Sequence, residues 1–125
     1  MVMRSKIFLT TLCGLAAALT LGCNSLKTPA TANVAVSKAA VENAAGAGGV
    51  EFAPVEMNAA REKLALANKA MSRKDYKQAV DLANQAQADA KLAQGKANSA
   101  KAQAAANALH DDIRILREEL NRANQ

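Results

Sequence analysis

The fold is decided by residues 75–104, which read DYKQAVDLANQAQADAKLAQGKANSAKAQA. Within this stretch alanine returns at alternating steps of four and three residues, at 79, 83, 86, 90, 93, 97, 100 and 104. Such steps place side chains on one face of an α-helix, and Tyr76 starts the same series one step earlier. The stretch therefore predicts a helix with one continuous apolar face, here called the alanine seam, whose contacts are mostly single methyl groups.

The composition allows only a thin core. Half of the 125 residues are hydrophobic, but 31 are alanine and only three are aromatic. Burial of a methyl group returns much less free energy than burial of leucine or phenylalanine, whereas alanine has the highest helix propensity. We therefore expect one all-α domain that is held together by long paired helices, and the net charge of +5 is too small to identify a partner.

Residues 1–22 have the features of an export signal. A basic start precedes the apolar run 7–21, and Gly22-Cys23 follows it. The run is shorter than the roughly 20 residues that span a membrane, so cleavage is favoured over the alternative of an uncleaved anchor. The ending Thr20-Leu21-Gly22-Cys23 resembles a bacterial lipobox, which implies cleavage before Cys23 and attachment of lipid to that cysteine.

The signal also predicts where the mature protein lies. Asn24 stands where many lipoproteins of the inner membrane carry Asp, so resemblance to sorted lipoproteins implies the outer membrane, with the chain facing the periplasm. Cys13 leaves with the signal, so one mature chain holds no disulfide and no cysteine metal site. We expect residues 23–30 to form the lipidated tether and the lipid on Cys23 to be the only attached group, with no cofactor.

Two helices are predicted before the alanine seam. The first covers about 31–45, with Thr31 as its N-cap and Gly46, Gly48 and Gly49 as its end, and a partly disordered arm is the alternative. The second covers about 54–72, where Ala53 and Pro54 start the helix and Phe52 staples onto Met57. Its apolar positions repeat like the first seam, at Met57, Ala60, Leu64, Ala67 and Met71.

The third helix is predicted over about 75–122, with Asp75 and Gln78 as a capping box. The short connection 72–74 forces it to pair with the second helix as an antiparallel, coiled-coil-like hairpin. Its last third carries a separate apolar row, the distal stripe, formed by Leu109, Ile113, Leu116 and Leu120. At 100° per residue this stripe points about 135° away from the alanine seam, so it either folds back onto the first helix or pairs with another molecule.

Catalytic and metal chemistry find no support in the residues. His110 is the only histidine, and adjacent acidic pairs such as Asp111-Asp112 diverge on a helix. The glycines of 46–49 lack the context of a phosphate loop. A group of cations, here called the basic tip, lies around the predicted connection and suits an anionic envelope component: Lys69, Arg73, Lys74 and Lys77.

Several short motifs carry a resemblance to one bacterial family. They are Phe52-Ala53-Pro54, the run from Ala60 to Leu64, Asp75-Tyr76, and the run from Gln85 to Ala90. On these motifs the chain resembles the alanine-rich envelope proteins grouped as the domain of unknown function 4398 family, over about residues 31–121. The resemblance implies an envelope location and a helical shape, and it implies no characterised activity.

Two functions are compatible with these observations. The first is a non-enzymatic outer-membrane lipoprotein that serves as a spacer or interaction module, with the membrane as one partner through its lipid and with a second copy or another envelope protein on the distal stripe. The second is a module that binds peptidoglycan or lipid phosphate through the basic tip. Nucleic acid is excluded as a partner by the predicted compartment.

Overall fold

The computed structural model describes residues 26–125, and all of its regular structure in that range is helical. Four helices follow one another: α2 (Lys27–Gly46), α3 (Gly49–Phe52), α4 (Pro54–Ser72) and α5 (Tyr76–Ala123). The all-α class is confirmed. The predicted signal (1–22) and the lipid-bearing Cys23 lie outside the described residues.

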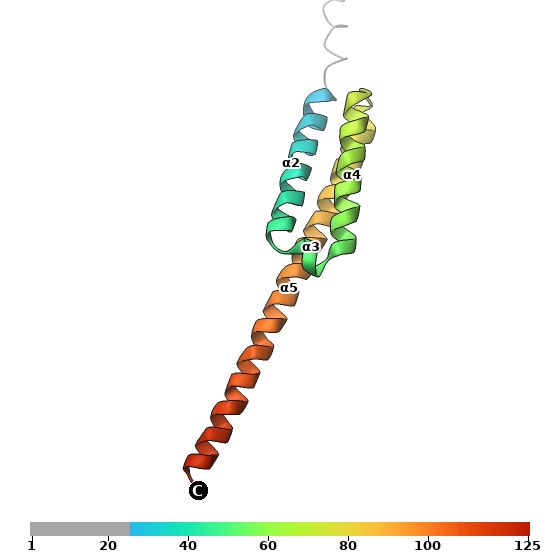
Figure 1. The fold of residues 1–125 in the computed structure, drawn as a ribbon. Helices are drawn as coiled ribbons and strands as arrows, with labels where there is room; N and C mark the ends of the chain where they lie inside the picture. Colours follow the sequence, from blue (N-terminus) through green and yellow to red (C-terminus); the bar gives the residue numbers. More distant parts are fainter. Residues whose placement is uncertain (1–25) are drawn as a thin grey trace, which may run out of the picture.

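The three long helices form a bundle, and the last of them, α5, continues beyond it. Helices α4 and α5 make the predicted antiparallel hairpin, and α2 lies against both of them, parallel to α5 (Figure 1). The single turn α3 closes the lower end of the bundle in this view, beside the point where α5 leaves it. The possible third helix of the bundle is therefore present and packed.

The connection between α4 and α5 is a tight helix ending followed at once by a helix start. The N–H of Asp75 donates to the carbonyl of Ala70 at 3.0 Å, and that of Lys74 donates to Met71 at 3.0 Å, which is the Schellman pattern. Lys74 occupies the left-handed position of this motif, with φ 62°. The Asp75 side chain then accepts from the N–H of Gln78 at 3.1 Å, so the predicted start of the last helix is confirmed.

Helix α2 begins earlier than the sequence predicts. It starts at Lys27 instead of Thr31, and Leu26 precedes it without a side-chain cap. The Thr31 hydroxyl donates backwards to the carbonyl of Lys27 at 2.9 Å, so Thr31 is not an N-cap. Ala30 is fully buried, hence residues 27–30 belong to the bundle and the predicted tether ends before them. The reason is tertiary: Ala30 packs in one cluster with Ala70 and Ala79.

The glycine-rich connection around residues 46–49 is a compact turn. Gly48 has φ 93°, a conformation that side chains disfavour. Gly49 is buried, and a Cβ at this position would lie 2.7 Å from the carbonyl oxygen of Ala44 and 2.9 Å from the sulfur of Met57. The close approach of α2 to α4 therefore requires glycine here, and the four-residue helix α3 was not predicted.

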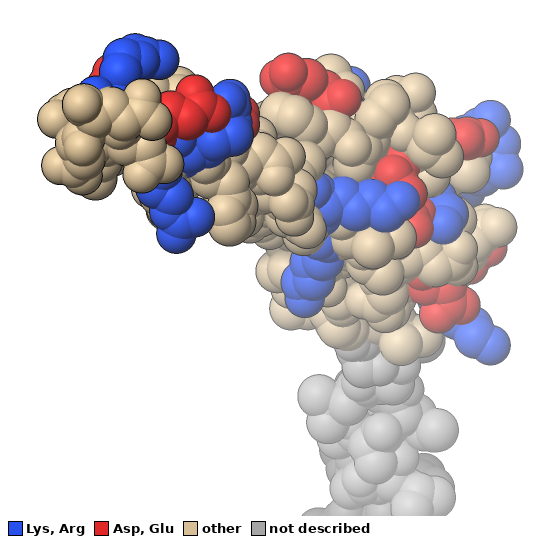
Figure 2. All heavy atoms as spheres, turned by 90° about the horizontal axis from the view of Figure 1, so that it is seen from below, with Lys and Arg blue, Asp and Glu red and all other residues tan. Residues whose placement is uncertain are grey.

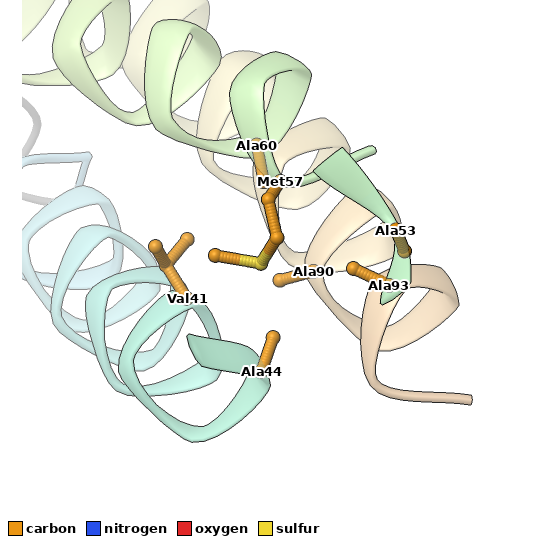
Figure 3. Packing of buried hydrophobic residues seen from close by; sticks show 7 residues of the cluster. All are labelled: Val41, Ala44, Ala53, Met57, Ala60, Ala90 and Ala93. Carbon is orange, nitrogen blue, oxygen red and sulfur yellow. The ribbon is translucent and has the colours of Figure 1, made fainter. Parts of the chain in front are cut away.

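The core consists of the expected small residues. Six members of the alanine seam, from Ala79 to Ala97, are buried. On α4 the apolar row rotates slightly, because Ala70 is buried while Leu64 and Met71 are only half-buried. Met57 is the largest fully buried side chain in the described chain, and it points toward Val41 between the three helices (Figure 3). The other members of that cluster are Ala44, Ala53, Ala60, Ala90 and Ala93.

The alanine seam stops being a core before its sequence pattern ends. Ala97 is its last buried residue, Ala100 is half-buried and Ala104 is exposed. Every residue from Lys101 onward is exposed, so of the two alternatives for the distal stripe the fold-back onto the first helix is excluded. At 1.5 Å per residue the 48 residues of α5 span about 72 Å, and the part after Ala97 extends about 39 Å beyond the last core layer (Figure 1).

Candidate functional surfaces

The projecting part of α5, residues 101–123, is here called the distal arm, and it carries the distal stripe. The exposed fractions of the stripe residues are 60% for Leu109, 37% for Ile113, 58% for Leu116 and 63% for Leu120. Scattered exposed leucines are common on protein surfaces, but four aligned on one unpacked helix face form a continuous apolar strip. Ile115 is also exposed, at 46%, and lies off this strip.

The charges of the distal arm are divided between two faces. Arg114 pairs with Asp111 at 3.7 Å and with Glu118 at 3.1 Å, on the side away from the stripe. Among the ion pairs of residues 26–125, Asp112 and Arg117 take part in none. In the view along the arm toward the bundle, cationic and anionic side chains alternate over the surface (Figure 2). The arm is therefore a mixed-charge helix with one apolar face.

A second surface is the end of the bundle opposite the arm. The four residues of the basic tip are all exposed there, around the connection from α4 to α5. The cluster of Ala30, Ala70 and Ala79 brings the first turn of α2 to the same end, so Lys27 joins them. The basic tip together with Lys27 is here called the basic end. Lys27 is not predicted to contribute to this surface, because residues 24–30 have no apolar period and predict a tether.

Two ion pairs join α4 to α5 along the side of the bundle. Lys63 Nζ lies 2.6 Å from Asp89 Oδ2, and Lys96 pairs with Glu56. The hydrogen bond from Lys96 lowers the pKa of Glu56 below its usual value. Both pairs have one partner on each helix, so they match the observed register of the hairpin, and partly exposed pairs of this kind add little stability. Their carboxylates are already engaged, which makes them poor candidates for proton transfer.

Side chains that could act in catalysis or bind a metal are dispersed over the described chain. His110 is exposed on the distal arm, and residues 26–125 contain no cluster of three or more side chains that would hold a metal ion. Ser37 is completely buried midway along α2, and its hydroxyl has no partner within the described structure. No helix in residues 26–125 combines the length and apolar character that crossing a membrane requires. The surfaces that remain for function are thus the distal stripe and the basic end.

The bundle, the arm and the basic end define a small helical protein with two exposed candidate surfaces and no assembled catalytic group among the described residues. The model of the family called domain of unknown function (DUF4398) matches residues 32–109, and the chain belongs to this family. The match covers the bundle except for the first turn of α2 and reaches the first residue of the distal stripe, Leu109. No curated protein and no solved structure matches the chain.

Proposed function

We propose that this protein is a non-enzymatic lipoprotein of the outer membrane, attached through lipid on Cys23 and facing the periplasm, in which the bundle carries the distal arm as a spacer or interaction module. The observation that supports the proposal most is the arm itself. Every residue of the arm is exposed from Lys101 to its end at Ala123, and the four large apolar side chains of the distal stripe lie on one face of it. An exposed apolar helix face of this kind is typical of a surface that another molecule covers.

The arrangement of the two ends supports a spacer. The first turn of α2 follows Cys23 by four residues, which reach at most about 14 Å in extended form. The arm leaves from the opposite end of the bundle (Figure 1). A lipid on Cys23 would therefore hold the basic end against the membrane and direct the distal arm away from it.

Mass spectrometry of the native N-terminus, combined with crosslinking in intact cells, tests this proposal. The expected N-terminus is an acylated Cys23, and Cys23→Ser is expected to abolish both the acylation and the cleavage before residue 23. Neighbours crosslinked to the full-length protein are expected to disappear for a variant that ends after Ala104. An unmodified Cys23, or the same neighbours with and without the arm, would refute the assignment.

A second candidate function has its own observation. The five cations of the basic end surround the point from which the N-terminal segment departs, so anionic lipid phosphate is the nearest possible ligand once Cys23 is lipidated. We propose this contact as an additional anchor. Peptidoglycan carboxylates are less favoured, because the end that would bind them faces the membrane in this orientation.

Vesicle binding separates the two ligands. In the Cys23→Ser chain, binding to anionic over neutral vesicles is expected to fall about fivefold for each removed cation. Residues 7–21 contribute apolar binding to both kinds of vesicle, so the ratio of anionic to neutral binding cancels that contribution. The variant replaces three basic-end residues, Lys69, Arg73 and Lys77, by glutamine, and the control makes the same change at Lys91, Lys101 and Arg122. Equal ratios for both variants, or binding to purified sacculi in place of vesicles, would refute the lipid contact.

A further inference from the structure

The distal stripe has the spacing of a coiled coil and not only that of an amphipathic helix. Leu109 and Leu116 occupy heptad positions d, and Ile113 and Leu120 occupy positions a. The same frame continues in both directions through alanines, at Ala102, Ala106 and Ala123. The frame from 102 to 123 covers about three heptads, which is the lower limit for a sustained coiled-coil pattern.

The bundle leaves this face free for a partner helix. The stripe points about 135° away from the alanine seam, and the seam is the face on which α2 and α4 pack. A helix lying along the stripe would therefore not collide with either of them. The exposed isoleucine Ile115 falls at heptad position c, on the outer side of such a pair.

The side chains at the a and d positions indicate two strands. A β-branched residue at a, together with leucine at d, favours a parallel dimer over higher oligomers. Ile113 is such an a residue, and it lies between two d leucines, Leu109 and Leu116. The central heptad of the arm thus has the dimer-forming combination.

The flanking charges select the direction. Asp112 and Glu119 fall at position g, and His110 and Arg117 at position e. In a parallel pair a g residue faces the e residue five positions later on the other helix, so Asp112 faces Arg117 of the second copy, twice by symmetry. An antiparallel pair would instead bring the acidic g positions together and the basic e positions together. Asp112 and Arg117 are also free of ion pairs within residues 26–125.

We propose that the distal arms of two copies pair as a parallel, in-register, two-stranded coiled coil. The occupant of the distal stripe is thus a second copy of this chain. The inference rests on the proposed function, because parallel arms place both basic ends on the same side, where one membrane holds both lipids. About three heptads give weak pairing in solution, and confinement to one membrane raises the effective concentration.

Sedimentation equilibrium of the full chain in detergent tests the dimer and its direction. Ile113→Asp with Leu116→Asp abolishes the dimer, whereas Ile115→Asp leaves it unchanged. Asp112→Arg and Arg117→Asp each lower the association constant about tenfold, and the two changes together restore it. Equal helicity by circular dichroism verifies that each variant keeps the arm folded. A stronger dimer with Asp112→Arg would overturn the parallel direction, and a monomer at every concentration would overturn the dimer.

Photocrosslinking in cells separates failure of this inference from failure of the proposed function. A benzophenone amino acid at 109, 113 or 116 of the full chain is expected to capture a second, differently tagged copy, and one at 115 is not. Capture of only a different protein at the stripe positions would overturn the dimer and leave the interaction module intact. No product at any stripe position would overturn both.

Discussion

Met57→Ala is the most informative change in the core. Met57 is 0% exposed, and its neighbours in the cluster are alanines, apart from Val41 (Figure 3). Truncation of a buried methionine costs about 2–5 kcal/mol, and the cost is highest where neighbours cannot move into the cavity. Alanines on three paired helices have no rotamers with which to fill the space. We therefore expect a loss of about 3–5 kcal/mol, a large share of the 5–15 kcal/mol typical of a domain.

The fluorescence of Tyr76 during urea unfolding measures this loss in the bundle alone. Tyr76 is the only tyrosine, the chain has no tryptophan, and the residue is half-buried at the end of the bundle opposite the distal arm. Far-ultraviolet circular dichroism would mix bundle unfolding with fraying of the arm, because both are helical. Leu66→Ala is the control, since Leu66 is 42% exposed and the same kind of truncation there is expected to cost less than about 0.5 kcal/mol.

Two results would refute the reasoning. One is a loss below about 1 kcal/mol for Met57→Ala at an unchanged slope of free energy against urea, which would mean that the methyl-lined core collapses around the cavity. The other is an equal loss for Leu66→Ala. Either result would show that the stability of the bundle depends on helix propensity and helix pairing, and not on the buried side chain of Met57.

Three further changes follow from local geometry and use the same fluorescence assay. Gly49→Ala is expected to cost about 1–3 kcal/mol because its Cβ meets the backbone of α2, whereas Gly46→Ala, with nothing within 4 Å, gains about 0.5–1 kcal/mol; equal effects would contradict the close approach. Lys74→Gly is expected to gain about 1 kcal/mol by relieving φ 62°, and a loss would contradict that strain. The Lys96 hydrogen bond lowers the pKa of Glu56, so its stabilisation is present above pH 4.5 and lost as the pH falls through the lowered value; Glu56→Gln is expected to reduce the decline of the urea midpoint between pH 6 and pH 3, and an unchanged decline would exclude the pair as its source.

The last helix and the hairpin could be predicted because their signals are local. The helical period of the alanine seam is visible in its residue spacing. Asp75 and Pro54 mark helix starts through their own hydrogen-bonding and backbone properties. Six seam alanines are buried as predicted, and α5 ends one residue from the predicted boundary of 122. These features needed no knowledge of what lies across the bundle.

The start of α2 and the turn α3 could not be predicted because they depend on partners distant in sequence. Nothing near Lys27 marks a helix start, and α2 begins there because Ala30 packs against Ala70 and Ala79. Gly49 reads locally as a helix breaker, yet its role is to let Met57 and the end of α2 approach. Such contacts between small residues carry almost no sequence signal.

The candidate surfaces divide in the same way. The distal stripe could be read from its spacing and is exposed in the structure, although spacing alone left open whether it folds back. The basic tip could be read from the short connection, whereas Lys27 joins it only through the packing of α2. Lipid attachment at Cys23 and the outer-membrane location stay predictions.

The part of α5 that follows the packed seam could change length without affecting the bundle. Lys101 still lies over the ring of Phe52, and every residue after it is exposed, so insertion or deletion of seven residues after Lys101 would disturb no buried contact. Each such step would move the tip by about 10.5 Å and turn it by only about 20°. Addition or loss of whole heptads could therefore change the reach of the arm without changing the bundle.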